Sequence, residues 1–427
     1  MRIGMPLNEK HDLGEPFERS SFAPAYYEDG RSHTGQFERA DTEPSPRQPI
    51  RATPFVWRDP KTLPPRRWLY GRHYIRQYAT ATIAPGGLGK SSLALVEALA
   101  MVTGRPLLGA EPRQRLRVWY WNGEDPLEEV ERRVLAACLY FGIDRAEIEG
   151  NLFLDSGREV PIVIARRLKD QTILQEPVIE DISAEIRSRG IDQLILDPFV
   201  SCHDVPENDN GAIDKVTKAW GGIAGATNCG VELVHHVRKA SGGQASYSVE
   251  DARGGSALIG AVRSARVLNV MSPEEAGNAG VPGELRRRYF RVDDGKSNMQ
   301  PPQDRAVWRH LESVGLGNGD DQDPEDLIGV VTEWAMPGLF DTIDADALRK
   351  VQAEVRQGTW AENVQAGNWV GRLIGDVLGL DPGDTAEKAK IKRVLATWIK
   401  NGALKVERQH DGSKGREKPV IVVGEPA

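Results

Sequence analysis

A glycine-rich segment with one lysine and two serines is the clearest chemical feature of this chain. It reads APGGLGKSS over residues 84–92, after an apolar run and before a helical pattern. Glycines let consecutive backbone N–H groups surround a phosphate, and a helix N-terminus adds partial positive charge. The residues expected to line such a phosphate site are Gly86, Gly87, Leu88, Gly89, Lys90, Ser91 and Ser92.

This pattern predicts a site for ATP with Mg²⁺. In a phosphate-binding loop, or P-loop, Lys90 would contact the β and γ phosphates and the Ser91 hydroxyl would ligate Mg²⁺. The strict pattern has glycine where Ala84 stands. A glycine-rich turn without a ligand is the alternative, and the flanking strand and helix patterns argue against it.

Two carboxylates end apolar runs and are candidates for the chemistry of hydrolysis. Asp197 closes QLILD, an arrangement typical of the Walker-B strand, and would hold Mg²⁺ at the carboxyl edge of a sheet. Glu124 ends VWYWNGE, and if its strand neighbours the P-loop strand it could deprotonate the attacking water. The alternative is that Glu124 and Asp125 favour the N-terminus of the next helix. We assign that capping role to Asp125, and catalysis to Glu124.

Two adjacent histidines, His235 and His236, follow the apolar run at residues 231–234. A polar residue there would face the γ-phosphate and could report hydrolysis to downstream loops, so His236 is a catalytic candidate and His235 a sensor candidate. Neighbouring strand residues point to opposite faces, which disfavours a shared metal ion.

Cationic residues follow this histidine pair and suggest two roles. Some could contact nucleic acid, and one could supply positive charge to the nucleotide site of a neighbouring subunit. A mobile loop that is cationic at its start and carries one aromatic residue could contact single-stranded DNA. An ordinary flexible surface loop is the alternative. Its candidate contacts are Arg238, Lys239, Tyr247 and Arg253. Arg263, expected on a short helix over residues 256–265, and Lys296 are candidates for a cation supplied in trans.

Short apolar runs alternate with amphipathic stretches through the middle of the chain, which predicts an α/β fold with a doubly wound, mostly parallel sheet. We expect strands at residues 78–83, 118–121, 152–154, 194–196, 231–234, 266–270 and 288–292. We expect helices at residues 91–102, 126–141, 178–189 and 212–226, the second of them capped by Asp125 and followed by Gly142.

Composition shifts divide the chain into four expected parts. Residues 1–50 are proline-rich and polar and read as a disordered tail, followed by an ATPase domain over 51–314. An acidic, glycine-rich linker is expected over 315–326, and a small α+β domain over 327–427. That last part resembles a winged helix, with a helix at 391–400 and a charged wing at 409–418, and could bind either DNA or protein.

Overall composition sets limits on partners and compartment. The net charge of −7 excludes a uniformly cationic protein that coats nucleic acid. Three separated cysteines without a CxxC pair exclude a disulfide framework and favour a reducing cytoplasm. No stretch reaches the roughly 18 apolar residues of a membrane span, and the N-terminus has no export signal.

Taken together, these motifs resemble those of RecA-type ATPases, and within them the RepA-like hexameric replicative helicases of plasmids and phages. The resemblance covers about residues 68–298 and rests on the order of APGGLGKS, GEDP, the LD of Asp197, HH, RGGS and KSN. It implies Lys90 on phosphate, Glu124 as base, Asp197 on magnesium, a histidine sensor and Arg263 as arginine finger.

The resemblance also implies a homo-oligomer, a hexameric ring around single-stranded DNA, and a replication initiator or loader as a possible further partner. DNA would contact the loops after Asp197 and after His236, although the first of these is acidic here (HDVPENDNG, residues 203–211). We therefore expect a DNA-dependent ATP hydrolase that acts as a replicative helicase. A nucleotide-switched DNA-binding or recombination protein that does not unwind DNA is the alternative.

Overall fold

The structure of this chain is a computed structural model. It describes residues 51–237, 246–252, 254–301, 306–338, 345–411 and 416–425. The expected tail at residues 1–50 therefore lies outside the described residues. Residues 51–63 belong to a first unit, Met1–Leu63, and the remainder, Pro64–Ala427, forms a second.

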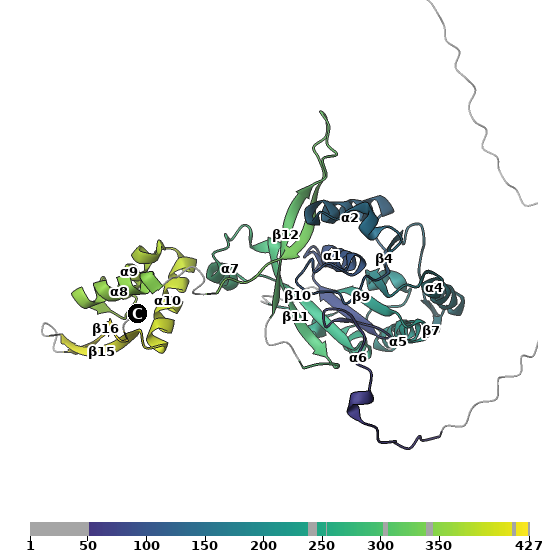
Figure 1. Ribbon diagram of the computed structural model, residues 1–427, viewed down its shortest axis with the longest axis horizontal. Coiled ribbons are helices and arrows are strands. Elements are labelled where there is room, and N and C mark those ends of the chain that lie inside the picture. Colours follow the sequence, from purple (N-terminus) through teal and green to yellow (C-terminus); the bar gives the residue numbers. More distant parts are fainter. Residues whose placement is uncertain are drawn as a thin grey trace, which may run out of the picture. The chain divides into compact units, whose positions relative to one another are not determined.

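A nine-stranded sheet forms the centre of the second unit (Figure 1). Its order is β13-β12-β11-β10-β3-β9-β8-β4-β5, with parallel pairing from β10 to β5 and antiparallel pairing from β10 to β13. The strands are β3 (Ala79–Ala84), β4 (Val118–Asn122), β5 (Leu152–Ser156), β8 (Gln193–Asp197), β9 (Gly230–His236), β10 (Ser264–Val270), β11 (Tyr289–Ser297), β12 (Val307–Gly315) and β13 (Leu327–Glu333).

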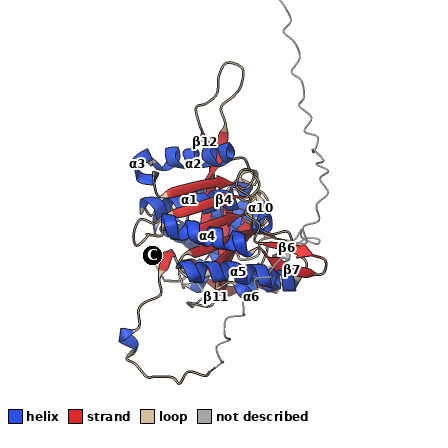
Figure 2. Ribbon diagram, turned by 90° about the vertical axis from the view of Figure 1, so that its right-hand side faces the viewer, coloured by secondary structure: helices blue, strands red, loops and turns tan. Residues whose placement is uncertain are grey.

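Helices cover both faces of this sheet, as Figures 1 and 2 show. One core packs under α1 (Lys90–Thr103) and α2 (Leu127–Phe141). The other packs under α4 (Glu176–Arg189), α5 (Asn210–Thr227) and α6 (Gly255–Ala261). The parallel strands are buried on both sides, which explains their nearly continuous apolar sequences. The predicted doubly wound α/β fold is confirmed.

Shorter elements complete this unit. They are β1 (Trp68–Tyr70), β2 (Tyr74–Ile75), α3 (Arg145–Ile148), β6 (Ala165–Leu168), β7 (Gln171–Leu174), α7 (Pro273–Ala279) and the 3₁₀ turns Phe199–Cys202, Val249–Asp251 and Arg286–Arg288. The hairpins β1–β2 and β6–β7 have too few residues for a clear alternating pattern, so the sequence did not indicate them.

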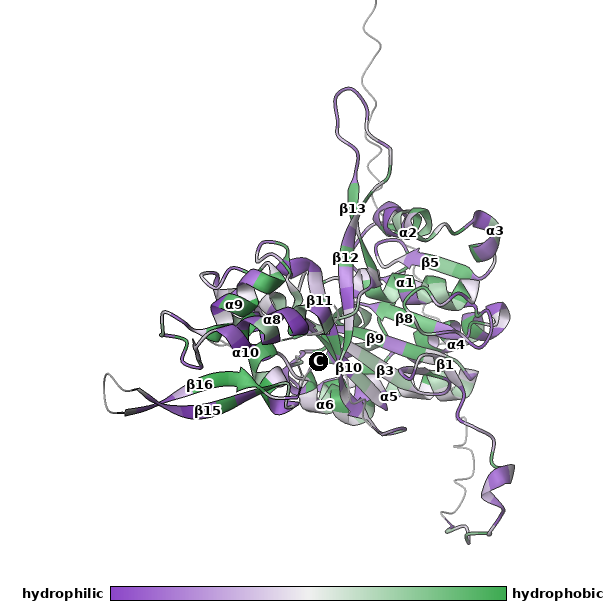
Figure 3. Cartoon of the chain, turned by 60° about the vertical axis from the view of Figure 1, so that its left-hand side comes forward, coloured by the Kyte–Doolittle hydropathy of each residue, from purple (hydrophilic) through white to green (hydrophobic). Residues whose placement is uncertain are grey.

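The prediction of a linker at residues 315–326 is wrong. These residues join β12 to β13, which pair in antiparallel register from Arg309↔Glu333 to Gly315↔Leu327. Figure 3 shows this hairpin extending beyond the sheet, with a hydrophilic loop at its tip. Acidic residues and glycines serve a hairpin loop as well as a linker, so composition could not distinguish the two. The last strand of the sheet therefore lies within the expected C-terminal domain.

A small α+β domain follows, beginning near Ala345 and not at residue 327. Its elements are α8 (Ala345–Gln357), β14 (Trp360–Ala361), α9 (Val370–Leu378), α10 (Thr385–Lys400), β15 (Leu404–Asp411) and β16 (Arg416–Val423). Three helices enclose their own apolar core against the sheet β14-β16-β15. The expected helix at 391–400 is the second half of α10, and β15–β16 form the expected wing, whose tip at residues 412–415 lies outside the described residues.

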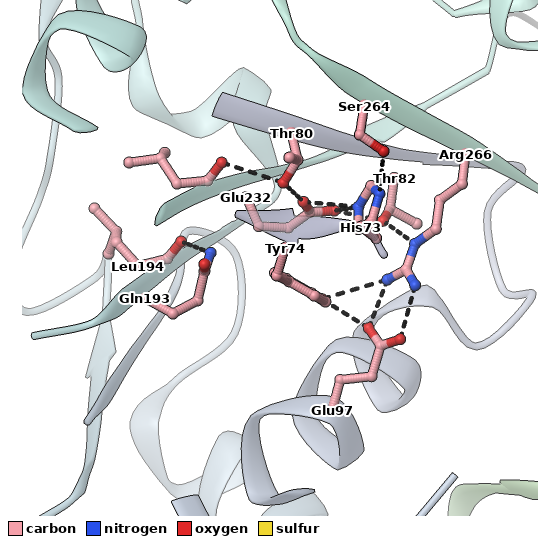
Figure 4. Close-up of polar contacts among 11 residues, drawn as sticks. His73, Tyr74, Thr80, Thr82, Glu97, Gln193, Leu194, Glu232, Ser264 and Arg266 are labelled. Atoms are coloured by element: carbon pink, nitrogen blue, oxygen red, sulfur yellow. Dashed lines mark hydrogen bonds and ion pairs between the residues drawn. The ribbon is translucent and has the colours of Figure 1, made fainter. Parts of the chain in front are cut away.

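A buried ionic network ties the P-loop helix α1 to three strands (Figure 4). Arg266 on β10 donates to both carboxylate oxygens of Glu97 on α1, at 2.7 and 2.5 Å, and to the Thr82 hydroxyl at 2.8 Å. Tyr74 donates to Glu97 at 2.7 Å. Burial opposes the charge of Arg266, but Glu97 raises its pKa overall. The network thereby fixes α1 on the sheet.

A second buried carboxylate, Glu232 on β9, continues this network. It accepts from the hydroxyls of Thr80 and Thr82 on β3 and lies 3.0 Å from Nε2 of His73. The other ring nitrogen of His73 is 2.9 Å from the Ser264 hydroxyl at the start of β10. Burial works against the charged form of Glu232, yet His73 lowers its pKa. The buried carboxylate of Glu232 therefore has partners on β3 and on His73 inside the fold.

Glu97→Ala should destabilise the fold strongly, because it leaves Arg266 buried without its carboxylate. We expect the free energy of unfolding in urea to fall by about 3–5 kcal/mol, as for one broken partner of a buried pair. The control is Glu185→Ala, which removes the exposed pair with Arg189 (2.9 Å). That variant should change stability by no more than about 0.5 kcal/mol. Equal losses in both variants would contradict the role of the network.

Residues 51–63 are exposed throughout and contain one short 3₁₀ turn, Pro60–Thr62. Its start is held by Asp59, whose carboxylate accepts from the Lys61 N–H at 2.9 Å. Across the described ranges, no helix is long and apolar enough to cross a membrane.

Candidate nucleotide and hydrolysis site

The glycine-rich loop lies between the end of β3 and the start of α1, as the sequence predicted. Gly87 and Gly89 have φ angles of +74° and +90°, which L-residues with a Cβ rarely adopt. A Cβ on Gly89 would also lie 3.1 Å from Leu311 of β12. The hydroxyl of Ser92 accepts from the Val331 N–H of β13 at 2.9 Å. The hairpin β12–β13 therefore packs directly on the loop and the first turn of α1.

Lys90 lies at the first position of α1 and is only 8% exposed. Burial lowers the pKa of Lys90, while the negative charges of Asp197 and Glu124 act in the opposite direction. Both carboxylates are thus close enough to the ammonium to affect its charge. The fold brings together the three residues that the sequence assigned to phosphate, magnesium and water.

Asp197 ends β8, the strand two places away from the P-loop strand, because β9 lies between them. Its carboxyl group is buried and accepts a hydrogen bond from the Tyr120 hydroxyl at 2.7 Å. Burial raises the pKa of Tyr120, and the charge of Asp197 adds to the effect. Tyr120 therefore remains protonated and donates to Asp197, which orients the carboxylate. Sequence analysis missed this tyrosine, since only the pairing of β4 with β8 brings the two together.

Tyr120→Phe should weaken magnesium use while leaving the fold intact. Loss of a hydrogen bond that orients a metal-binding carboxylate typically reduces metal affinity about 10–100-fold. We expect the Mg²⁺ concentration for half-maximal ATP turnover to rise about tenfold. The matched control is Tyr78→Phe, a half-buried tyrosine outside the site. An unchanged Mg²⁺ requirement would show that Tyr120 only fills space.

Glu124 follows β4 and has an exposed side chain that water can reach. The condition set for this role, that its strand neighbours the P-loop strand, is not met, because β9 and β8 lie between β3 and β4. The negative charge of Glu124 nevertheless acts to raise the pKa of Lys90, because β3, β9, β8 and β4 all end at the same edge of the sheet. The turn is held by Asn122, whose side-chain oxygen accepts from the N–H groups of Glu124 and Asp125 at 3.0 and 2.7 Å.

Asp125 is not the helix cap that the sequence predicted. The helix begins at Leu127 with Pro126 at the N-cap position, and its N-terminus has no side-chain cap. The Asp125 carboxylate instead pairs with Arg133 on α2 at 2.8 Å. Burial acts to lower the pKa of the Arg133 guanidinium, but the negative charge of Asp125 raises it overall. The positive charge of Arg133 also lowers the pKa of Lys90, so the structure adds a second cation to the site.

The residues present fit a magnesium ion that arrives with a nucleotide. Within the described part of the chain, no group of three or more histidine, cysteine or acidic side chains could hold a metal by itself. Mg²⁺ usually binds one or two carboxylates together with substrate phosphates and water. Asp197 and the Ser91 hydroxyl at the start of α1 are the groups that would hold it, and it would neutralise charge on the phosphates.

The two histidines at the end of β9 lie on opposite faces, as expected. His236 pairs in register with Ala84, the last residue of β3, and shares its face with Val234 under α1. His235 is buried on the other face, against the Phe199 ring at 5.6 Å, and 4.0 Å from the Glu207 carboxylate. His236 is thus the histidine beside the P-loop, and His235 contacts the segment after Asp197.

Only one of the candidate DNA contacts can be located. Arg238, Lys239 and Arg253 lie outside the described residues. Tyr247 is half-buried and packs on the core, with its backbone bonded to the Asn269 side chain at 2.6 and 2.9 Å. Its position is therefore fixed by β10.

The two candidates for a cation acting in trans lie together at the amino edge of β10. Arg263 is not on a helix as expected, because α6 ends at Ala261 and the residue precedes β10 directly. Its side chain is exposed, and it makes no ion pair among the described residues. Lys296 instead donates to the carbonyls of Ile259 and Gly260 at the end of α6. Burial and the charge of Arg263 lower its pKa.

The sheet order, the loop and the carboxylates define a RecA-like P-loop nucleotide-binding domain. Comparison with known families agrees, because residues 44–242 match a model described as an AAA domain. The match includes the P-loop, Glu124, Asp197 and both histidines, and ends before Arg263 and Lys296. This region is therefore similar to an AAA domain, which agrees with a P-loop ATPase fold, a class that binds nucleotides, usually with Mg²⁺.

Proposed function

We propose that this protein is an ATP-dependent DNA motor, a ring-forming replicative DNA helicase that hydrolyses ATP at subunit interfaces. The observation that supports the ring is the position of Arg263. It precedes β10, which runs parallel to β3 and next to it, whereas the P-loop follows β3. Arg263 and the P-loop are therefore at opposite edges of the sheet, roughly 20 Å apart for a strand of the length of β3.

An exposed arginine at that distance cannot serve the P-loop of its own chain. A second copy that places its P-loop edge against the Arg263 edge would receive the cation needed for transition-state charge. Head-to-tail contacts of this kind close into rings when the rotation permits. The exposed Glu124 favours hydrolysis over a pure nucleotide switch, since a switch needs no residue that activates water.

DNA as the substrate of the motor is supported by the charge of the C-terminal domain. Residues 388–418 contain ten basic and three acidic residues, and the exposed face of α10 carries Lys392, Arg393 and Lys400. Such cations bind nucleic-acid phosphates without reading sequence.

The decisive experiment measures ATP hydrolysis with and without single-stranded DNA, together with mass by light scattering in ATP and Mg²⁺. A forked duplex in the same reaction tests unwinding. We expect a closed oligomer, DNA-stimulated turnover and strand displacement. Turnover without displacement would favour a DNA-dependent ATPase that does not unwind, and an active monomer would contradict the ring.

Glu124→Gln should separate binding from hydrolysis. The amide keeps the size of the side chain but cannot accept a proton from water, and a general base contributes about 10²–10⁴-fold. We expect nucleotide affinity near that of the wild type and turnover lower by about that factor. The control is Glu128→Gln, an exposed glutamate in the first turn of α2. A parallel loss of binding and turnover would make Glu124 a structural residue.

A further inference from the structure

A buried histidine joins two strands at the amino edge of the sheet, beside the residue that follows Arg263 (Figure 4). His73 lies in the turn between β1 and β2 and is 9% exposed, and Ser264, the first residue of β10, is 6% exposed. The Nδ1 atom of His73 lies 2.9 Å from the Ser264 hydroxyl, and its Nε2 atom lies 3.0 Å from the Glu232 carboxylate. Within the described ranges, His73 is the one hydrogen-bond partner of that hydroxyl. The strand end beside Arg263 is therefore tied to β9 through His73.

The groups around Glu232 give this histidine a defined orientation. Burial acts to raise the pKa of Glu232, but His73 and its other partners lower it overall, so the carboxylate is charged. A charged carboxylate only accepts hydrogen bonds, and it accepts here from Nε2–H of His73 and from the hydroxyls of Thr80 and Thr82. In the neutral ring, Nδ1 then accepts the hydrogen of the Ser264 hydroxyl. Glu232 therefore fixes the ring, and the ring holds Ser264.

The backbone at Arg263 lies where the pairing of β10 becomes irregular. Its N–H donates to the Ala79 carbonyl at the start of β3 at 3.1 Å, and its carbonyl accepts from the Asn298 N–H at 3.3 Å. The register between β10 and β11 shifts one residue after Ser264. A shift of this kind marks a bulge, which bends a strand and re-aims its side chains. The contact between His73 and Ser264 holds this irregular end of β10 against the rest of the sheet.

We infer that His73 is a positioning residue for Arg263. It acts through Ser264, which fixes the end of the strand from which the Arg263 side chain leaves the sheet. The inference rests on the proposed function, because it takes Arg263 as the cation supplied to a neighbouring subunit. Such a cation must reach the transition state of another chain, and a displacement of about 1 Å can cost about 10²-fold in rate.

The same polar network reaches the P-loop helix of its own chain, as Figure 4 shows. The hydroxyl of Thr82 donates to Glu232 and accepts from Nε of Arg266 at 2.8 Å. Arg266 in turn donates to Glu97 on α1. The buried groups that hold Ser264 are therefore in unbroken contact with the groups that fix α1. Arg263 is thus positioned from the rigid centre of its own domain.

Ser264→Ala in the full-length chain removes the contact with the smallest change. We expect ATP turnover to fall by about 10–100-fold, because Arg263 is displaced. Affinity for a fluorescent ATP analogue should stay near that of the wild type, because the P-loop is intact. The matched control is Ser183→Ala, a buried serine on α4 outside the network, which should keep both properties. Unchanged turnover in Ser264→Ala, or an equal loss of binding and turnover, would overturn the inference.

Mixed assemblies distinguish a misplaced Arg263 from damage to the variant's own nucleotide site. Chains with Ser264→Ala keep the base, and chains with Glu124→Gln keep a well-placed Arg263, so one kind of interface in their mixture is complete. We expect the turnover of this mixture to exceed that of either variant alone. A mixture of Ser264→Ala with Arg263→Ala chains should show no recovery. The opposite result in either mixture would overturn the inference.

Two substitutions of His73 separate positioning from a role in stability alone. His73→Asn keeps a polar group near the Nδ1 position, toward Ser264, whereas His73→Gln keeps one near the Nε2 position, toward Glu232. We expect His73→Asn to retain more turnover than His73→Gln, even where unfolding in urea shows it to be the less stable of the two. Turnover that follows stability, with His73→Gln the more active, would overturn the inference.

The mixture of Arg263→Ala with Glu124→Gln chains separates a failure of this inference from a failure of the proposed function. No recovery in that mixture contradicts Arg263 as a cation that acts on a neighbour, which belongs to the proposed function. Recovery there, together with wild-type turnover in Ser264→Ala, contradicts only the role of His73 and leaves the proposed function intact.

Discussion

Lys90→Ala should reduce ATP turnover to background without unfolding the domain. The ammonium lies at the first position of α1, where it would neutralise the β and γ phosphates. The side chain is buried, and burial lowers the pKa of Lys90 although Asp197 and Glu124 act in the opposite direction. Its removal therefore costs binding and catalysis and should cost little stability. Turnover in a coupled assay and unfolding in urea measure the two effects separately.

The matched control for this variant is Lys218→Ala. Lys218 is an exposed lysine on α5 that pairs with Asp214 at 2.6 Å, far in sequence from the P-loop. It should keep wild-type turnover and nearly wild-type stability. Wild-type turnover in Lys90→Ala would contradict the assignment of the nucleotide site.

Arg263→Ala should lower turnover on the order of 10³-fold, the contribution expected of an arginine finger. Binding of ATP should change little, because the P-loop of each chain is intact. The alternative, that Arg263 only pairs with a nearby acid, predicts nearly full activity. No acidic partner of its side chain occurs among the described residues, which favours the larger effect.

Mixed assemblies show whether Arg263 acts on a neighbour. Arg263→Ala chains and Glu124→Gln chains are each inactive, but an interface with the base from one chain and the finger from the next is complete. Turnover above that of either variant alone therefore identifies action in trans. If confirmed mixed assemblies show no recovery, Lys296 becomes the better candidate, and Lys296→Ala should then show the complementation. Because Lys296 also bonds the end of α6, its variant needs an unfolding control.

Local patterns in the sequence predicted most elements of the ATPase domain within a few residues. The strand expected at 194–196 is Gln193–Asp197, and the helix expected at 126–141 is Leu127–Phe141. Strands buried on both faces need continuous apolar residues, and a helix that covers a sheet needs a regular apolar stripe. The P-loop was recognisable for the same reason, since Gly87 and Gly89 adopt positive φ angles that few other residues tolerate.

The predictions that were wrong concerned contacts between segments and the ends of elements. The acidic segment at 315–326 reads equally well as a linker or a hairpin loop, and only the pairing of β12 with β13 decides between them. Asp125 has the right residue type and position for a cap, yet its carboxylate pairs with Arg133, nearly two turns into α2. The carboxylate forms an ion pair with a residue eight positions away and does not cap the helix N-terminus. Sequence periodicity does not indicate which of these partners it takes.

By itself, then, the sequence determined the phosphate loop, the acidic ends of two strands and the doubly wound class of fold, because each depends on residues close together in the chain. The tertiary structure alone decided that β9 lies between the P-loop strand and the Asp197 strand, and that Tyr120 holds Asp197. It also decided that Arg263 lies at the edge of the sheet opposite the P-loop. Strand order depends on long-range pairing, and many orders bury the same apolar residues equally well.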